Sequence, residues 1–299
     1  MKGIILAAGA GTRLYPASLP ISKILLPIYD KPMIYYPLST LMLAGIREIL
    51  IITNEDDYDN FRKLLGDGSQ LGLSLSYKIQ YVQRGIADAF IIAEDFIGND
   101  DVALILGDNI FHGFGFSTIM KKAIANNKGA TVFGYRVKDP ERFGVVEFNN
   151  DKKVLSLEEK PTNPKSKYAV TGLYFYDKNV CKYAKELEPS ARGELEITDL
   201  NKIYLSKGIL DVEILGRGFA WLDTGTHESM LQASNFIQSL EQNKGEKIAC
   251  LEEIAINNQY ISTEQVLKNI SKYKNKSNYY NYILEIIEDK QKSEVFVNA

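Results

Sequence analysis

The chain has 299 residues, of which 45% are hydrophobic and 24% charged, and its formal net charge is −3. This composition suits one large α/β domain, or a domain with an appended subdomain, that buries an ordinary core. The charge argues against a broad nucleic-acid-binding surface, and no run of about 18 apolar residues predicts a membrane span. With two distant cysteines and a strand directly at the N-terminus, we expect a cytoplasmic protein without a signal peptide or disulfide scaffold.

Short apolar runs alternate with helical patterns through the first two-thirds of the chain. Seven runs have the composition of strands: Gly3–Ala7, Glu48–Thr53, Leu75–Gln80, Val102–Leu106, Ala130–Tyr135, Gly144–Phe148 and Gly172–Tyr176. The segments between them predict helices at Met33–Leu43, Asp57–Leu65, Ala87–Phe96 and Thr118–Ala125. Near-continuous apolar strands separated by amphipathic helices predict an α/β fold, with a mainly parallel Rossmann-like sheet covered by helices on both faces.

Residues 140–160 have a different pattern. The strand Gly144–Phe148 runs into an Asn/Asp turn, and Lys153–Leu157 then reads as a returning strand. We therefore expect an antiparallel insertion beside the parallel sheet, within a part of the domain that covers residues 140–225.

The last third of the chain is predicted to be largely helical. One helix starts near Glu196 and another runs from His227 to Glu241. After Gly245 the pattern becomes short helices with much Asn, Lys and Tyr, which predicts a first domain over residues 1–244 and a C-terminal helical subdomain over 245–299. We expect the polar stretch Lys272–Asn281 to be a surface loop, with an oligomer contact as the alternative.

The loop after the first strand is the strongest functional signal. It reads Leu-Ala-Ala-Gly-Ala-Gly-Thr-Arg-Leu over residues 6–14, and Lys23 follows. Glycine lets backbone N–H groups approach phosphate oxygens, and Arg13 and Lys23 can neutralise their charge. The dinucleotide pattern fails because Leu14 stands where its third glycine would be, and the P-loop pattern is absent. The loop therefore favours a nucleoside triphosphate site, with an ordinary tight turn as the alternative.

Two acids follow apolar strands at positions where ligands bind in parallel sheets. Asp108 comes directly after Val102–Leu106, and Asp223 follows Trp221 and Leu222. Two carboxylates that converge on a triphosphate would hold Mg²⁺ through hard oxygen ligands. The alternative is structural, with Asp108 in an Asx-turn and Asp223 or Thr226 capping the next helix.

Two further polar stretches carry cations. Glu159 and Lys160 end one predicted strand, and Arg192 lies in a later loop. The lysine and the arginine could grip a second phosphate, and the glutamate could bind sugar hydroxyls. A solvated strand end is the alternative interpretation of the Glu-Glu-Lys run.

In this order, the motifs resemble the sugar-nucleotide pyrophosphorylases, and most of all their bacterial thymidylyltransferase branch. The resemblance extends to about residue 257 and includes residues 6–14, Lys23, 25–39, 107–109, 157–161, 170–174, 190–198 and 221–227. It implies that a glucose 1-phosphate oxygen attacks the α-phosphorus of dTTP in line. The products would be dTDP-glucose and pyrophosphate, formed with Mg²⁺ for deoxysugar or surface-polysaccharide synthesis.

The resemblance also implies residue roles. The nucleotide site would comprise Leu6, Ala8, Gly9, Ala10, Gly11, Thr12, Arg13, Lys23, Gln80, Gly85 and Asp108. The sugar-phosphate site would comprise Gly144, Glu159, Lys160, Val170, Tyr174 and Arg192, and the metal ligands would be Asp108 and Asp223. The catalytic set is then Arg13, Lys23, Asp108, Lys160 and Asp223. No protein nucleophile or strong base is required, because the attacking phosphate is already ionised near pH 7.

Several positions depart from the family pattern around the base. Ile24 stands where a glutamine is usual, and Tyr81–Arg84 replaces a Pro-Ser-Pro-Asp type segment. An apolar pocket for the thymine methyl discriminates by only about 1–3 kcal/mol. Two alternatives therefore stay open: a UTP-preferring uridylyltransferase, and a catalytically silent regulatory subunit that binds sugar nucleotides.

Members of this family are typically homotetramers with a second nucleotide site for feedback inhibition. The corresponding positions here are Leu43, His112, Gly113, Gly216, Arg217 and Ile256. His112 stands where a tyrosine is usual, and the expected arginine is missing after Ile256. The resemblance thus implies a homotetramer and leaves feedback control open.

Overall fold

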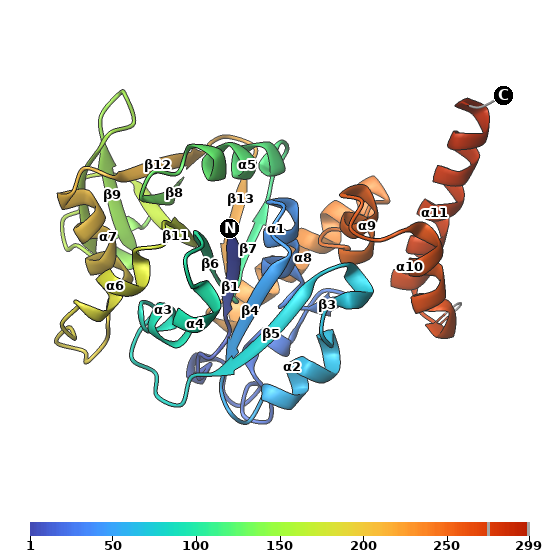
Figure 1. Ribbon diagram of the computed structural model, residues 1–299, viewed down its shortest axis with the longest axis horizontal. Helices are drawn as coiled ribbons and strands as arrows, with labels where there is room; N and C mark the ends of the chain where they lie inside the picture. Colours follow the sequence, from blue (N-terminus) through green and yellow to red (C-terminus); the bar gives the residue numbers. More distant parts are fainter. Residues whose placement is uncertain (274–275, 298–299) are drawn as a thin grey trace.

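The computed structural model describes residues 1–273 and 276–297, with residues 291–297 described by their backbone only. Its centre is a nine-stranded sheet with the strand order β10-β9-β11-β6-β1-β4-β5, while β8 lies beside β11 and β12 beside β8. Helices cover both faces, which confirms the expected α/β fold class (Figure 1). Among the helices of the described residues, none is long and apolar enough to cross a membrane.

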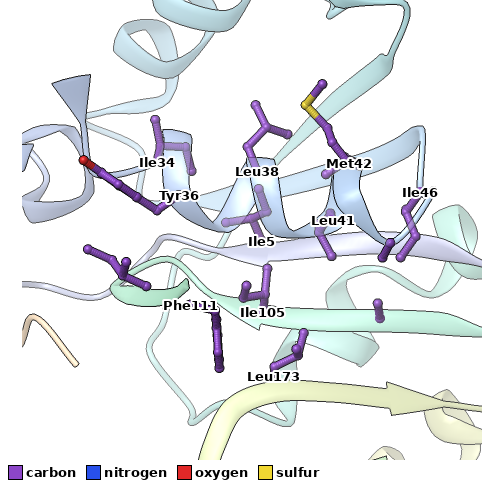
Figure 2. Packing of buried hydrophobic residues seen from close by; sticks show 14 of the residues in the cluster. Ile5, Ile34, Tyr36, Leu38, Leu41, Met42, Ile46, Ile105, Phe111 and Leu173 are labelled. Atoms are coloured by element: carbon purple, nitrogen blue, oxygen red, sulfur yellow. The ribbon is translucent and has the colours of Figure 1, made fainter. Parts of the chain in front are cut away.

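The parallel half of the sheet comprises β1 (Lys2–Leu6), β4 (Glu48–Thr53), β5 (Ser74–Ile79) and β6 (Val102–Leu106). Ile4 and Ile5 of β1 are both fully buried although they point to opposite faces. Both faces of β1 are therefore covered, which is why the strand reads as a continuous apolar run. Figure 2 shows Ile5 and Ile105 of this sheet packed beneath Leu38 and Leu41 of α1 (Tyr35–Leu43).

The other half is built around a long antiparallel strand, β11 (Tyr168–Tyr176), which pairs with β6 and with β8 (Ala130–Arg136). The predicted hairpin forms from β9 (Gly144–Phe148) and β10 (Val154–Glu159), preceded by a 3₁₀ turn, η4 (Pro140–Arg142). An additional strand, β12 (Leu210–Leu215), pairs in parallel with β8 and was not predicted. Its Asp211 and Glu213 alternate with apolar residues because β12 lies at an edge of the sheet.

Helices connect these strands: α2 (Tyr58–Leu65), α3 (Asp88–Ile92), α4 (Glu94–Ile97), α5 (Phe116–Asn126), α6 (Val180–Lys185), α7 (Ile197–Ser206) and α8 (His227–Lys244). The prediction of one helix over Ala87–Phe96 is wrong, because the backbone leaves the helical conformation at the fully buried Ala93. The α8 helix begins with a capping box in which Thr226 and Ser229 bond to each other's backbone N–H.

Several short elements complete the fold. They are η1 (Thr12–Leu14), η2 (Lys23–Leu25), a hairpin of β2 (Pro27–Ile28) and β3 (Lys31–Pro32), η3 (Ser69–Leu71), and a second two-stranded sheet of β7 (Asn109–His112) and β13 (Ala220–Asp223). These pieces were not predicted, because two to four residues carry no periodicity that distinguishes a strand from a loop.

The C-terminal helices α9 (Leu251–Asn257), α10 (Thr263–Ile270) and α11 (Asn278–Val297) follow, with η5 (Ser271–Tyr273) between the last two. They share a small apolar cluster that includes Cys250, Val266 and Ile283, on the side of the molecule opposite α7 (Figure 1). The loop expected over Lys272–Asn281 is wrong at both ends, since η5 covers Tyr273 and α11 begins at Asn278. Residues 274–275 of that stretch lie outside the described residues.

Candidate active site

The glycine loop leaves β1 at the carboxyl edge of the parallel strands. Gly11 has φ +63°, a left-handed conformation that an L side chain rarely adopts. Its carbonyl accepts a hydrogen bond from Ser18 Oγ at 2.7 Å, and a Cβ at Gly11 would lie 3.3 Å from Lys23 Cβ. The loop therefore folds back so that the start of η2 presents Lys23 beside Gly11.

A cavity of about 740 Å³ opens between this loop and the antiparallel half of the sheet. It is lined by residues that are far apart in the sequence but were predicted to act together: Gly11, Thr12, Arg13, Lys23, Asp108, Gly144, Glu159, Lys160, Val170, Tyr174 and Asp223. The structure thus brings both halves of the predicted site to one cavity, at the strand ends where α/β sheets bind ligands.

Other predicted residues lie outside the cavity lining: Leu6, Ala8, Gly9, Ala10, Gln80, Gly85 and Arg192. Gln80 is buried and donates to Asp88 Oδ2 at 3.0 Å, so its amide is turned toward α3. Arg192 pairs with Glu196 at 2.8 Å and lies 4.0 Å from Glu159 Oε1. Arg192 therefore does not line the cavity itself but lies next to Glu159, which does.

Gly85 occupies a narrow contact between two loops. It has φ +98°, and a Cβ there would lie 2.6 Å from the carbonyl oxygen of Leu195. The backbone N–H of Leu195 donates to the Arg84 carbonyl at 2.6 Å, and Ala87 N–H donates back to Leu195 at 3.2 Å. The expected base-binding loop and the loop that carries Arg192 are thus joined by backbone hydrogen bonds.

The pairing of β7 with β13 brings the two predicted metal ligands together. Asn109 is the register partner of Asp223, so Asp108 lies next to Asp223 at the end of the pair. The backbone N–H and Oγ1 of Thr224 donate to the Asp108 carbonyl at 3.1 and 2.8 Å. These bonds fix both carboxylates at the same edge of the cavity.

The side chain of Asn109 supports the position of Asp108 through three hydrogen bonds. Its Nδ2 donates to Asp108 Oδ1 at 2.9 Å, and its Oδ1 accepts from Gly172 N–H and Trp221 Nε1 at 3.0 and 2.6 Å. A Cβ on Gly172 would lie 2.6 Å from that Oδ1, so only glycine leaves room for the contact. Asn109 thereby links Asp108 to β11 and β13.

The two acids have opposite electrostatic surroundings. Burial alone would raise the pKa of Asp108, but Lys23 Nζ contacts its Oδ2 and holds that pKa below its ordinary value. Burial, followed by the charge of Asp108, raises the pKa of Asp223, while Lys23, Arg13 and Arg142 act in the opposite direction. Asp223 forms no ion pair within 4 Å in the described part of the chain.

The donor set fits Mg²⁺. Two adjacent carboxylates offer hard oxygen ligands with negative charge that one ammonium does not fully balance. Within residues 1–273 and 276–297, no group of three or more His, Cys, Asp or Glu side chains is arranged to hold a metal. Asp108 and Asp223 would therefore leave coordination positions for water and phosphate oxygens.

The sugar-side residues gather at the open end of the β9–β10 hairpin. Glu159 is the register partner of Gly144, and its Oε2 accepts from Thr198 Oγ1 at 2.6 Å. A Cβ on Gly144 would lie 3.3 Å from both of those oxygens. Lys160 follows with φ +42°, and its Nζ lies 3.8 Å from Glu159 Oε1. The Glu159 carboxylate, an acceptor, and the Lys160 ammonium, a cation, therefore lie close together, next to the space left by the missing side chain of Gly144.

Arg142 and Asn201 are two of the cavity residues that were not predicted from the sequence. Arg142, in η4, lines the cavity while its guanidinium pairs with exposed Asp139 at 2.6 Å and lies 5.4 Å from the Phe143 ring. Asn201 lines it from α7, one helical turn after Thr198. The i, i+3 spacing from Thr198 was a signal for Asn201, whereas nothing local distinguished Arg142 from a solvated turn residue.

The residues expected at a second nucleotide site lie outside this cavity. Leu43 ends α1, where its carbonyl accepts from Ser117 of α5 at 2.8 Å. Gly113 follows β7 and has the Phe219 ring so close that a Cβ would lie 2.3 Å from it. The α9 helix, which contains Ile256, packs against α1 through Asn258, which donates to the Met42 carbonyl at 3.1 Å. Gly216 and Arg217 follow β12, and His112 pairs with Ala220 across β7 and β13.

One cavity thus combines a glycine loop, two adjacent carboxylates and a second basic subsite, an arrangement suited to nucleotidyl transfer. The chain belongs to the nucleotidyl transferase family, whose model matches residues 2–240. The expected family and enzyme class are thus confirmed.

Relatives and solved structures agree with this assignment. The chain is 59% identical over 288 residues to the glucose-1-phosphate thymidylyltransferase of Neisseria meningitidis, covering 96% of this chain and 100% of the relative. It is 53% identical to the enzyme of that name from Mycolicibacterium smegmatis, with 96% and 99% covered. A Bacillus anthracis protein solved in complex with sucrose is 46% identical with a TM-score of 0.73, over 79% of this chain and 94% of that one. A UDP-glucose pyrophosphorylase solved with UDP-glucose shares the fold at 24% identity and a TM-score of 0.71, over 80% and 98%.

Proposed function

We propose that the protein is a glucose-1-phosphate thymidylyltransferase. It transfers dTMP from dTTP to α-D-glucose 1-phosphate and releases dTDP-glucose and pyrophosphate. The observation that carries this proposal is the single cavity in which Arg13, Lys23, Asp108 and Asp223 face Glu159 and Lys160. The names of the relatives from Neisseria and Mycolicibacterium support the choice of substrates.

On the nucleotide side, the chain binds and positions the triphosphate. Arg13 and Lys23 line the cavity beside Gly11, where backbone and side-chain donors can meet phosphate oxygens. Mg²⁺ bound by Asp108 and Asp223 would supply charge neutralisation at the α-phosphate and the leaving pyrophosphate. Arg142 faces Asp223 and adds a cation at the same edge.

On the sugar side, Lys160 and Arg192 hold the attacking phosphate while Glu159 binds hydroxyl groups of the sugar. Thr198 donates to Glu159 Oε2, so Oε1 is the carboxylate oxygen turned toward Lys160 and Arg192. The attacking oxygen is already ionised, so the side chains need only align it with the α-phosphorus and screen the repulsion between two anions. No covalent enzyme intermediate is involved.

The residues expected near the base of the nucleotide are Ile24, Gln80 and Gly85. Ile24 is buried against Gly107, where a Cβ would lie 3.1 Å from it, and does not line the cavity. Gln80 and Gly85 would meet the base through the loop that Leu195 braces. We expect dTTP to be preferred, with some use of UTP, because a methyl-sized apolar contact contributes only about 1–3 kcal/mol.

The test is pyrophosphate release by purified protein with glucose 1-phosphate, Mg²⁺ and each of four nucleoside triphosphates. We expect the highest kcat/KM with dTTP. A preference for UTP above about tenfold, roughly 1.4 kcal/mol, would make the protein a uridylyltransferase instead. Release at background with every nucleotide, but binding of dTDP-glucose, would indicate the catalytically silent regulatory subunit.

The wider setting follows from the same proposal. We place the enzyme in the cytoplasm, supplying dTDP-glucose for deoxysugar or surface-polysaccharide synthesis. We further propose a homotetramer, a catalytic domain over residues 1–244 and a helical subdomain over 245–299. A second nucleotide site around Leu43, His112, Gly113, Gly216, Arg217 and Ile256 belongs to this proposal. Sedimentation velocity would test the tetramer, and inhibition by dTDP-sugars at saturating dTTP would test the second site.

A further inference from the structure

The amide of Asn201 is a buried polar group on the sugar side of the cavity. Asn201 is 1% exposed, yet it lines the cavity together with Ile197 and Thr198 of the same helix, α7. These three positions, spaced i, i+1 and i+4, form the helix face that looks into the cavity. A buried amide with two donors and an oxygen acceptor needs partners for all of them.

One half of this amide is held by the protein. Tyr176 Oη donates to Asn201 Oδ1 at 2.6 Å. The Tyr176 ring is itself fixed, because it packs edge-on against Phe90 at 5.1 Å and in a tilted arrangement against Tyr204 at 5.4 Å. The bond therefore sets the orientation of the Asn201 amide, with its oxygen toward β11.

The other half of the amide is its nitrogen, Nδ2. In the described part of the chain, Asn201 Nδ2 makes no hydrogen bond. The fully enclosed polar side-chain atoms that lack a partner there belong to Thr53, Asn127 and Thr171. Since Asn201 is not among them, its Nδ2 is not fully enclosed, and the residue lines the cavity. Asn201 Nδ2 is therefore an oriented hydrogen-bond donor, without an acceptor in the described residues, on a residue that lines the cavity.

We infer that Asn201 is a specificity-determining residue that donates a hydrogen bond to a ring hydroxyl of the sugar 1-phosphate. This inference rests on the proposed function. A hydroxyl oxygen accepts from Asn201 Nδ2 and gives its own proton to an acceptor, and Glu159 is bonded to Thr198 one turn away on the same helix. The phosphate is the poorer candidate, since it is drawn to the cations Lys160 and Arg192.

The chemistry predicts strong discrimination. When a site is built to bond a hydroxyl, an analogue that lacks it leaves a buried donor unpaired, which costs more than the loss of an apolar contact. One of the 2-, 3-, 4- and 6-deoxy analogues of glucose 1-phosphate should therefore bind to the wild-type protein about 10-fold or more weakly than glucose 1-phosphate. The position of that analogue names the hydroxyl.

The experiment measures equilibrium binding of glucose 1-phosphate and its four deoxy analogues to three proteins by calorimetry. They are the wild type, Tyr176→Phe, and the double variant Tyr176→Phe/Asn201→Leu. The double variant replaces both bonded partners with apolar groups of similar size, which avoids an orphaned buried group. Tyr176→Phe keeps the donor and should keep the wild-type ranking of analogues, while thermal unfolding confirms that each variant is folded.

We expect the discriminating deoxy analogue and glucose 1-phosphate to bind the double variant within about threefold of each other, with dTTP binding unchanged. Equal discrimination in the double variant and the wild type, or none in the wild type at any ring position, would overturn the role of Asn201. These outcomes differ from those expected if the proposed function is wrong. If the protein is not a thymidylyltransferase, pyrophosphate release with dTTP is absent even though the sugar phosphate still binds.

Discussion

Replacing Asp223 with asparagine should have opposite effects on catalysis and on stability: turnover should fall, while the melting temperature of the protein should rise. Asparagine keeps the size and one oxygen of the aspartate but removes the negative charge beside Asp108. If the pair holds Mg²⁺, turnover should fall about 100-fold or more, the range seen when one charge-stabilising group is lost from a transition state. The metal concentration needed for half-maximal rate should rise at the same time.

The empty protein should become more stable in the same variant. Burial and the neighbouring Asp108 raise the pKa of Asp223, so the ionised form is disfavoured in the folded state. A carboxylate with a raised folded pKa weakens the fold as pH rises above its unfolded value of about 3.9. Relief of about 1 kcal/mol at pH 7 corresponds to a melting temperature about 2 °C higher, and this gain should shrink toward pH 4.

The assay pairs steady-state pyrophosphate release over a Mg²⁺ series with thermal unfolding at pH 7 and pH 4 in a metal chelator. Asp95→Asn is the matched control, since Asp95 is a 95% exposed carboxylate outside the cavity that pairs with Lys78 at 3.7 Å. Near-normal turnover at limiting Mg²⁺ would refute the metal assignment. A melting temperature that falls at pH 7 would show that Asp223 stabilises the empty protein and that our account of its surroundings is wrong.

Three further substitutions test other parts of the site and fold. Lys160→Ala should raise the KM for glucose 1-phosphate by an amount worth about 2–4 kcal/mol while the KM for dTTP stays within twofold; Lys165→Ala, which loses only a pair with Glu158, is the control. Gly85→Ala would place a Cβ 2.6 Å from the Leu195 carbonyl and should weaken both substrates about 10-fold in steady-state assays. Gly98→Ala has a similar positive φ but open space, so it should leave both KM values unchanged. Tyr279→Phe removes the 2.6 Å bond to Glu252 and should lower the melting temperature by about 2–5 °C without changing the transfer rate.

The sequence predicts the parallel half of the sheet well because those strands are buried on both faces. Ile4 and Ile5 alternate in direction yet are equally apolar, as a strand covered on both faces requires. The edge strand β12 escaped prediction because Asp211 and Glu213 break its apolar run. The helix break at Ala93 has no sequence signal, since alanine is a strong helix former and the break is imposed by packing.

For the site, the sequence predicted which side chains could take part in binding or catalysis, but not how the fold brings them together. Asp108 and Asp223 become neighbours through β7 and β13, which have four residues each and no distinguishing pattern. The amide of Gln80 turns to Asp88 because the buried carboxylate lies across the loop, a relationship that spacing alone does not determine. Asn201 could have been found by helical spacing from Thr198, but only once that face of α7 was known to line the cavity.

The position of Lys23 explains how the chain keeps two adjacent carboxylates in a folded protein without a bound ligand. Its ammonium contacts Asp108 and also opposes part of the rise in the pKa of Asp223. One cation therefore reduces the repulsion between the two carboxylates, which would otherwise oppose folding more strongly. Lys23 also lines the cavity beside Gly11, where a phosphate would enter. Mg²⁺ held by Asp108 and Asp223 would neutralise the two carboxylates, and the Lys23 ammonium would then be available to the phosphate oxygens.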